Sequence, residues 1–569
     1  MAQDLPAAQE FTQQLQTLLF SDLALDGASA LTDAFKLDLA REACGWAAIR
    51  PAGGPKVRIR HARMDTSAVA ILEIINDDMP FLVDSVVGEL QAHGLPARLL
   101  FHPILKVERD RHGTLERIVG VGDRNWGDGR QESLIVVLLD DMSEATAGQV
   151  TAALEQTLAD VRLAVTDWQT MLARFDRAMQ TLADQPPPVA PGLLAETLAF
   201  CRWLREGQFT FLGCREYKLV NGAATGEQVP LENTGLGVLR DPSLHVLSRD
   251  GDPLAMTPEI ARVLLNPNPL IIAKSNITSR IHRRVTMDYI GLKTYAKDGR
   301  LAGELRIVGL FTSKVYTETA RQIPFVRHKI EHVVGESGFA PGSHAAKALV
   351  NVLETFPRDE LFQIGEAQLK DWSRGIVDLE LRPRVRVFAR RDRFDRYVSV
   401  LVYAQRDRYS TSVRERIGQL LADAYQGAIT AFTPFFPEGP LVRVHFVVTR
   451  DQTPAIEVDV VDLERRITDV TRTWGDQLAS AVTAAGPAQA TLAANYARAF
   501  PPGYTETFAP ARALEDIARI ERLSPERPVA IDFYREAGDP LARVRAAIYR
   551  FDRPIPLSDR VPVLENLGF

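Results

Sequence analysis

Cysteine is scarce in this chain of 569 residues, which contains only Cys44, Cys201 and Cys214. The number is odd and no pair has the Cys-x-x-Cys spacing, so the sequence argues against a disulfide framework and against a cysteine-based zinc site. The first residues, MAQDLPAAQEFTQQL, lack the basic and apolar segments of a signal peptide. No apolar run reaches the roughly 18 residues of a membrane span. We therefore expect a cytoplasmic protein.

Common catalytic motifs are also missing. A dinucleotide fingerprint needs three glycines between a strand and a helix, and both Gly120-Val-Gly122 and Gly235-Leu-Gly237 lack the third. The sequence contains no Walker A segment, no His-Glu-x-x-His and no Gly-x-Ser-x-Gly. We therefore predict no catalytic, cofactor-binding or metal-binding residue in this chain.

Charge is close to balanced, with a formal net charge of −6. This argues weakly against nucleic acid as the main partner. One segment departs from the balance, because residues 382–416 hold eleven arginines and four acidic residues. They could attract an anion, although protected strand edges and ion pairs between domains explain them more simply.

The pattern along the chain predicts an α+β protein of several domains. Proline-rich QPPPVAPG at 185–192 marks one linker, because proline does not continue a helix. The segments that we expect are a helical stretch at 1–50, an α+β domain at 51–184 that ends in a long helix, a second α+β domain at 193–375 with trailing helices, a third at 380–490, and the start of a fourth at 500–569.

The first α+β domain shows its elements clearly. SAVAILEIIN (67–76) predicts a buried strand, and Val83, Val86, Val87 and Leu90 lie on one face of a following helix. Asp77 or Asp78 would cap that helix, with Pro80 in its first turn. Three strands and a helix from about 143 to 184 follow. The order resembles the ferredoxin-like βαββαβ pattern, with helices on one face of an antiparallel sheet and room for one more strand at the start.

This strand–helix unit recurs twice. Without gaps, Asp552 aligns with Asp78, Pro554 with Pro80 and Leu564 with Leu90. A third copy near 396–435 aligns Ile417 with Val86 and Leu421 with Leu90, and its Phe432-x-Pro434 matches Phe101-x-Pro103. The copy at the C-terminal end would leave a sheet edge and an apolar helix face exposed. We therefore expect this chain to be the N-terminal piece of a longer protein.

Three groups of polar residues are candidate sites. Asp77, Asp78 and Asp84 frame the first turn, where capping explains them and a small ligand is the alternative. Lys274, Arg280, Arg283 and Arg284 gather near one strand, where they could bind a phosphate or a carboxylate or could contact another domain. His328 and His332 have helical i, i+4 spacing and could share a metal, but a solvated helix face is the simpler interpretation because no nearby residue completes a ligand set.

Several long phrases resemble the N-terminal region of the large bacterial NAD-specific glutamate dehydrogenases. They are INDDMPFLVDSV, FTFLGCREYKL, GLGVLR, KSNITSRIHRRVTMDYIGLKTY and GELRIVGLFTSKVYTE. The resemblance extends over essentially the whole chain. It implies ACT-like modules at 51–184, 380–490 and, truncated, 500–569, with a PAS-like domain at 193–375.

The resemblance also implies a function. The full-length enzyme would be a homo-oligomer that converts L-glutamate and NAD to 2-oxoglutarate, ammonium and NADH, through a catalytic domain that lies farther along the chain. NAD would bind there and not in this region. The ACT-like turns DDMPFL and FDRPIP lack the glycine that usually follows the proline in amino-acid-binding ACT domains, which counts against an effector site.

Two other interpretations remain. The chain could be a non-catalytic, amino-acid-sensing ACT protein. It could also bind RNA through ferredoxin-like sheets, but it lacks the aromatic pattern and the basic charge of such proteins.

Overall fold

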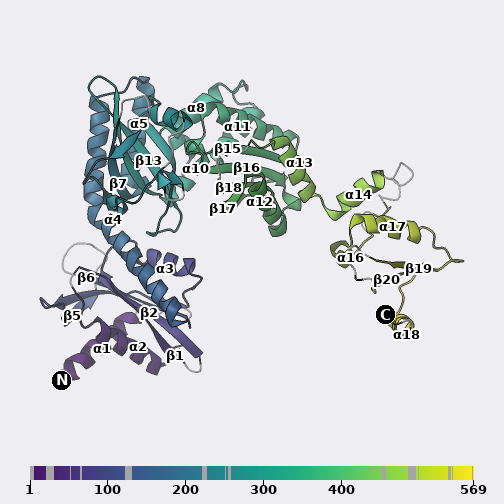
Figure 1. Cartoon of the computed structure of the whole chain (residues 1–569), viewed down its shortest axis with the longest axis horizontal. Coiled ribbons are helices and arrows are strands. Elements are labelled where there is room, and N and C mark those ends of the chain that lie inside the picture. Colours follow the sequence, from purple (N-terminus) through teal and green to yellow (C-terminus); the bar gives the residue numbers. More distant parts are fainter. Residues whose placement is uncertain are drawn as a thin grey trace. The chain divides into compact units, whose positions relative to one another are not determined.

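The computed structural model describes residues 5–20, 31–51, 53–64, 67–121, 131–220, 227–249, 252–253, 258–450, 457–484, 495–496, 499–535, 540, 543–566 and 568. The chain divides into two compact units, Met1–Val377 and Asp378–Phe569, which are described separately. Each unit contains antiparallel sheets and helices (Figure 1), so the predicted α+β class is confirmed. No helix among these residues is long and apolar enough to span a membrane.

The first module of unit 1 is built on a six-stranded sheet. Its strands are β1 (Lys56–Met64), β2 (Ser67–Asp77), β3 (Leu99–Phe101), β4 (Ile104–Arg109), β5 (Leu115–Val121) and β6 (Gln131–Asp140). The order is β1-β2-β6-β4-β5, and β3 also pairs with β6. Strand β1 occupies the edge beside β2 that the last strand of a βαββαβ module would take. The sequence pattern left room for a strand before β2 but assigned no residues to it.

Helices cover both faces of this sheet, whereas the sequence analysis expected one covered face. Helices α1 (Leu5–Leu19) and α2 (Asp33–Ala47) share a core with Val69, Ile71 and Ile75 of β2. Helices α3 (Leu82–Ala92) and α4 (Glu144–Asp184) lie on the opposite side (Figure 1). Strand β2 is therefore buried on both faces, which explains its continuous apolar sequence.

Helix α4 runs from the first module into the second α+β domain. Ser143 caps it by accepting a hydrogen bond from the Thr146 amide. Its first half packs on β1 and α3, and its second half packs on strands of the next sheet. A single helix of 41 residues thus joins the two domains of unit 1.

The second domain of unit 1 also has a six-stranded sheet. It begins with α5 (Pro191–Trp203) and a short π-helix, η2 (Leu204–Gln208). The strands are β7 (Phe209–Leu219), β8 (Gln228–Pro230), β9 (Leu236–Gly237), β12 (Leu270–Thr278), β13 (Thr286–Tyr295) and β14 (Leu301–Phe311). Their order is β12-β13-β14-β7-β8, with β9 beside β7.

Short elements connect these strands, and helices follow them. The connecting elements are the 3-10 helix η4 (Val238–Arg240), the two-stranded pair β10 (Ser248–Arg249) and β11 (Asp252–Pro253), and α6 (Pro258–Leu265). The helices that follow are α7 (Ser313–Thr317), η5 (Ala320–Gln322), α8 (Val326–Gly335), α9 (His344–Glu354), α10 (Arg358–Gln363) and α11 (Glu366–Leu381).

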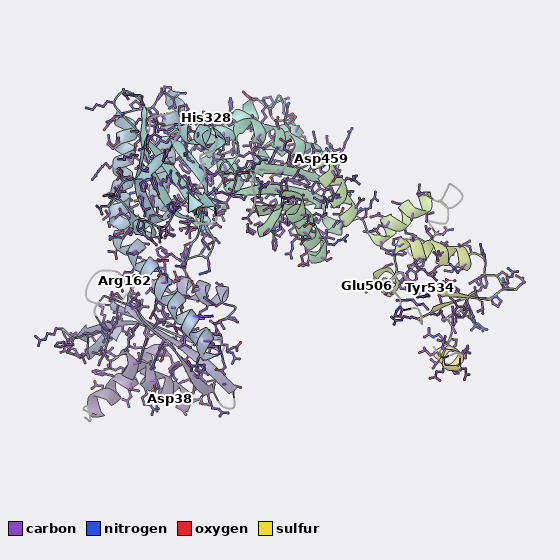
Figure 2. The ribbon with its side chains drawn as sticks, in the orientation of Figure 1. Asp38, Arg162, His328, Asp459, Glu506 and Tyr534 are labelled. Atoms are coloured by element: carbon purple, nitrogen blue, oxygen red, sulfur yellow. The ribbon has the colours of Figure 1, made fainter. Side chains whose placement is uncertain are left out.

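Unit 2 begins with the second module. Strands β15 (Arg386–Arg391), β16 (Tyr397–Gln405), β17 (Gly427–Phe435) and β18 (Leu441–Arg450) pair in the order β15-β16-β18-β17. The 3-10 helix η6 (Arg406–Arg408) precedes α12 (Thr411–Tyr425), and α13 (Val460–Thr471) follows β18. Asp459 caps α13 by accepting hydrogen bonds from the Val461 and Asp462 amides (Figure 2).

The third module is a helical group followed by a hairpin. Its helices are α14 (Trp474–Ala484), α16 (Pro502–Thr507) and α17 (Pro510–Ile520). Strands β19 (Val529–Tyr534) and β20 (Arg545–Arg550) form a two-stranded sheet, and α18 (Leu557–Asn566) follows. Each of the three modules therefore contains two consecutive antiparallel strands followed by a helix: β1, β2 and α3, then β15, β16 and α12, then β19, β20 and α18.

The predicted repeat is correct for α3 and α12, but the matching positions of α18 are not buried and not every strand keeps the register. Val86 and Leu90 on α3 and Ile417 and Leu421 on α12 are all buried. The Phe-x-Pro match is one residue out of register, however. Phe101 shares the core of α1 and α2, whereas Phe432 lies on the opposite face, under Arg414 of α12. A bulge between Ile429 and Ala431 shifts β17 by one residue, which moves its side chains to the other face.

Candidate functional site

The turn that joins β2 to α3 differs from its prediction. Phe81 precedes the first helical residue with φ +73°, and no side chain caps α3. Pro80 therefore precedes the helix, and neither Asp77 nor Asp78 caps it. The backbone amide of Asp78 donates to the Gln131 carbonyl at 2.9 Å, which places Asp78 against the start of β6. Burial raises the pKa of the Asp78 carboxyl.

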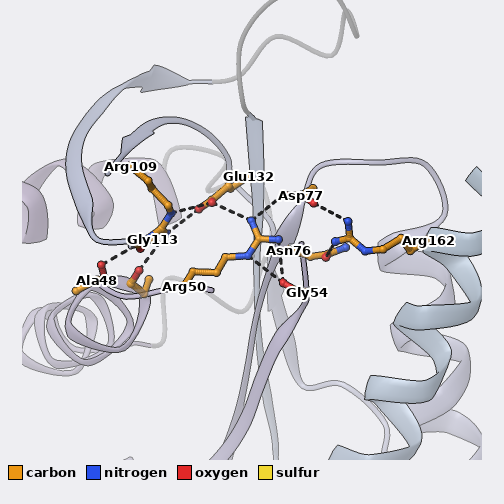
Figure 3. Close-up of polar contacts among 10 residues, drawn as sticks. Ala48, Arg50, Gly54, Asn76, Asp77, Arg109, Gly113, Glu132 and Arg162 are labelled. Atoms are coloured by element: carbon orange, nitrogen blue, oxygen red, sulfur yellow. Dashed lines mark hydrogen bonds and ion pairs between the residues drawn. The ribbon is translucent and has the colours of Figure 1, made fainter. Parts of the chain in front are cut away.

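A buried charged network lies beside this turn (Figure 3). Glu132 at the start of β6 accepts hydrogen bonds from Arg50 and from Arg109, each at 2.8 Å. All three side chains are at most 6% exposed. Arg109 also donates to the Ala47 and Gly113 carbonyls. The network therefore ties the end of α2 to the sheet.

Gly113 is required by the same network. Its φ is +84°, and a Cβ atom there would lie 1.9 Å from the Arg50 carbonyl oxygen. Only glycine fits this close approach. The Arg50 amide donates to the Gly113 carbonyl at 2.9 Å, which fixes the chain just before β1.

Asp77 extends the network to α4. Its carboxylate pairs with Arg50 at 2.9 Å and with Arg162 at 2.7 Å, and Arg162 also donates to Asn76 (Figure 3). Asp77 is partly buried, but the hydrogen bonds from the two guanidinium groups lower its pKa. Asp77 therefore joins the turn to the long helix α4.

These contacts predict opposite results for two neighbouring acids. Asp77→Asn should lower the free energy of unfolding by about 1–2 kcal/mol, because two charged hydrogen bonds weaken at a half-exposed site. Asp78→Ala should change it by less than about 0.5 kcal/mol, because Asp78 neither caps α3 nor pairs with a cation. Urea unfolding of both variants checks this. A loss of about 0.5–2 kcal/mol for Asp78→Ala would restore the capping interpretation.

Helix α3 meets the second domain of unit 1 through Asp84 and Glu89, which bind His282 and Arg284. Asp84 accepts from His282 at 2.8 Å, and the His282 amide donates to the Ser85 hydroxyl at 2.9 Å. Arg284 pairs with Glu89 of α3, which is 3% exposed. His282 and Arg284 therefore hold α3, as a basic surface that contacts another domain would.

The remaining basic candidates point to internal partners. Lys274 lies between two carboxylates, at 2.6 Å from Asp288 and 3.1 Å from Asp359. Arg283 donates to the Phe311 carbonyl, and Arg280 donates to Asp160 at 3.4 Å. The described contacts do not gather Lys274, Arg283 and Arg284 around one anion.

His332 and several arginines of the segment 382–416 also form ion pairs. His332 pairs with Glu366 at 2.8 Å and with Glu336 at 3.2 Å. No cluster of three or more His, Cys, Asp or Glu side chains suited to a metal occurs among the described residues. In the arginine-rich segment, Arg386 pairs with Glu464 and Arg396 with Asp392. Both pairs lie within the second module, whereas the sequence suggested ion pairs between domains.

Sequence reasoning missed the acids that organise these contacts. They are Glu89, Glu132, Asp167 and Asp288, and all four are buried. Asp167 of α4 accepts from both the Arg240 side chain and the Gly237 amide. Each of these acids stands inside an apolar strand or on an apolar helix face. Because a buried carboxylate is normally paired, this position could have predicted a cation partner.

Five family models match the chain in order. They describe glutamate dehydrogenase segments: the ACT1 domain at 15–155, helical motif 1 at 323–382, the ACT2 domain at 386–475, helical motif 2 at 480–523 and the ACT3 domain at 528–569. The chain belongs to the family of large NAD-specific glutamate dehydrogenases. The first two modules correspond to its ACT1 and ACT2 domains. The third combines helical motif 2, which contains α16 and α17, with the ACT3 domain, which contains β19, β20 and α18.

Three curated relatives carry the name NAD-specific glutamate dehydrogenase. The Halomonas elongata protein is 34% identical over 522 residues, and the Pseudomonas aeruginosa protein is 35% identical over 528 residues. Each alignment covers 90% of this chain and 32% of the relative. The Mycobacterium tuberculosis protein is 27% identical over 536 residues, 91% of this chain and 31% of the relative. The chain thus spans about a third of the length of these relatives.

Proposed function

We propose that this chain is the regulatory and assembly region of an NAD-specific glutamate dehydrogenase. The full-length enzyme would convert L-glutamate, NAD and water to 2-oxoglutarate, ammonium and NADH. The observation that carries the proposal is the ordered series of five glutamate dehydrogenase segments along one chain. The five matched segments are ACT domains and helical motifs, which supports a non-catalytic role for this region.

The topology supports the finer fold assignment. In the second module, the central strands β16 and β18 lie between β15 and β17. This is the ferredoxin-like strand arrangement, with the fourth strand of βαββαβ placed first in the chain. The second domain has the order β12-β13-β14-β7-β8. If β7 is strand one, that order is 3-4-5-1-2, which supports the PAS-like assignment.

We propose that the candidate site residues act in assembly rather than in effector contact. Asp84 and Arg284 find their partners on the neighbouring domain of unit 1. Asp77 binds two arginines of its own module. These contacts connect the ACT1 turn to α4 and to the second domain. Asp77, Asp84 and Arg284 would therefore fix the position of the turn rather than bind a ligand.

The remaining partners follow from the family. The region would work with the catalytic domain of the same chain, in a homo-oligomer, without nucleic acid or membrane. NAD would bind to the catalytic domain. The three cysteines are free and buried, which suits a reducing compartment such as the cytoplasm.

A turnover assay tests the proposal. The purified 569-residue protein should produce no NADH from saturating glutamate and NAD, whereas the full-length polypeptide should produce it at an ordinary enzymatic rate. Absorbance at the NADH band measures both. Measurable turnover by the 569-residue protein would place catalysis in this region, and an inactive full-length polypeptide would refute the enzyme assignment.

A further inference from the structure

Two residues with unusual backbone angles meet where α3 approaches the second domain of unit 1. Phe81, just before α3, has φ +73°, and His282, between β12 and β13, has φ +63°. The centres of their rings lie 5.3 Å apart, at an angle of 47°. The left-handed region costs free energy for a residue with a Cβ atom, most of all for a bulky one such as phenylalanine. Such strain persists only where surrounding contacts hold it.

The Ser85 hydroxyl holds both strained residues at once. It donates to the Phe81 carbonyl at 2.5 Å and accepts from the His282 amide at 2.9 Å. Asp84, the neighbouring residue on α3, accepts from the His282 ring at 2.8 Å. Ser85 is 1% exposed. The backbone of the β2–α3 turn and the position of His282 are therefore linked through one buried side chain.

The loop that carries His282 keeps its shape by its own contacts. The Ser279 hydroxyl donates to the Ile281 carbonyl at 2.8 Å and accepts from the Ile281 amide at 3.0 Å. Arg283 donates to a carbonyl at the end of β14. All of these bonds lie within the second domain, so they do not depend on α3. The loop 279–285 is thus a preformed element, and its separation from α3 breaks only the contacts between the two.

Charged pairs complete the contact. Arg284 pairs with Glu89 of α3, which also accepts from Thr157 at 2.9 Å. Arg280 lies 3.4 Å from Asp160 of α4, and its side chain is 46% exposed. Polar interfaces of this kind between domains of one chain permit relative motion.

A second contact between ACT1 and the second domain is built without such strain. Asp167 of α4 accepts from the Gly237 amide at 2.8 Å and pairs with Arg240. The φ of Gly237 is +58°, which glycine adopts readily. This contact has no strain to release, so it would keep the two domains together while the contact at α3 opens.

We propose that residues 81–89 and the loop 279–285 form a strained latch, which opens and closes in the folded protein and couples the backbone of the β2–α3 turn to the second domain. Opening breaks the hydrogen bonds and ion pairs to α3 and allows the two strained residues to relax to common backbone angles. A ligand or partner that favours one backbone state of the turn therefore shifts the latch, and the reverse holds with the same free energy. The proposal rests on this geometry and does not depend on the enzyme assignment.

A disulfide across the latch tests the proposal. A Cβ atom at Gly88 of α3 would lie 3.9 Å from the Arg284 Cβ atom, a separation that suits a disulfide. Gly88→Cys and Arg284→Cys are combined in the 569-residue protein, whose native cysteines are buried. The variant is oxidised with glutathione disulfide and compared with its own reduced form. Hydrogen exchange of the His282 amide is measured by mass spectrometry, with the Gly237 amide as the matched control.

We expect the His282 amide to exchange at least tenfold more slowly in the oxidised form, because the disulfide prevents opening. The Gly237 amide should exchange at the same rate in both forms. Equal rates at His282, or an equal change at both amides, would overturn the proposal, because exchange would then not require local opening of the latch. Failure of the two thiols to join would also overturn it, because α3 and the loop would not be in contact.

Two substitutions at Phe81 test the coupling itself. Phe81→Ala and Phe81→Asn both remove the ring contact with His282, but asparagine adopts left-handed backbone angles more readily than alanine does. We therefore expect the His282 amide to exchange at least threefold faster in Phe81→Ala than in Phe81→Asn. If the two variants exchanged at the same rate, the backbone of the turn would have no influence on the loop of the second domain, and the proposal would be wrong.

Discussion

Replacing Glu132 by alanine should lower the free energy of unfolding of this protein by about 3–5 kcal/mol. The substitution leaves the Arg109 guanidinium, which is 6% exposed, without the carboxylate that it pairs with, while Arg50, which is 3% exposed, keeps its pair with the half-exposed Asp77. Removing one partner of a buried ion pair is costly because the remaining charge has lost its hydration and its counter-charge. Urea unfolding followed by circular dichroism measures the loss.

The matched control is Glu108→Ala. Glu108 pairs with Arg117 at 2.7 Å, but the two side chains are 51% and 62% exposed. Water screens such a pair, so the control should lose no more than about 1 kcal/mol. If Glu132→Ala were as mild as the control, Glu132 would not organise the module, and the network at the β2–α3 turn would be incidental.

Elements with a strong apolar period were predicted well. The strand expected at 67–76 is β2, and the helix expected from about 143 to 184 is α4. Burial on both faces makes β2 continuously apolar, and a long amphipathic helix repeats its pattern many times. These signals are local, so the sequence alone carries them.

Strand β1 carried a weaker signal. Its residues KVRIRHARM alternate Val57 and Ile59 with arginines, and arginine is not an obvious member of a packed strand. The structure shows why arginine fits, because Arg58 and Arg60 pair with buried Glu73 on the adjacent strand. The compensating acid is 13 to 15 residues away along the chain and cannot be inferred from β1 itself.

The cap predicted for helix α3 was wrong for a similar reason. An acidic pair before a helix predicts a cap when no other partner competes for it. Here Asp77 is bound by Arg50 and by Arg162, which lies 85 residues farther along the chain. The partners of the candidate site residues are set by tertiary packing, so residue types could be predicted while their pairings could not.

A second large effect is expected at Lys274. Lys274→Met should lower the free energy of unfolding by about 3–5 kcal/mol at pH 7, because Asp288 and Asp359 would then lose the ammonium group that lies between them, and Asp288 is buried. Tyr316 donates to Asp359, and the Phe311 amide donates to Asp288, but neither supplies a positive charge. Lys370→Met is the control, because Lys370 pairs with Glu336 at a more exposed site.

The pH dependence separates this explanation from simple loss of packing. Burial, with the nearby charge of Asp359, raises the pKa of Asp288 to about 6 even though Lys274 opposes the shift. The folded protein therefore binds more protons at Asp288 than the unfolded chain does between about pH 4 and pH 6, and this group's contribution to stability falls as pH rises through that window. Without Lys274 the pKa of Asp288 should rise further.

The loss of stability in Lys274→Met should thus be largest at neutral pH. It should shrink as the pH is lowered toward 5, as the carboxylates take up protons. Thermal melting at a series of pH values measures this, and a defect of constant size from pH 5 to pH 8 would show that the lysine contributes through packing rather than charge.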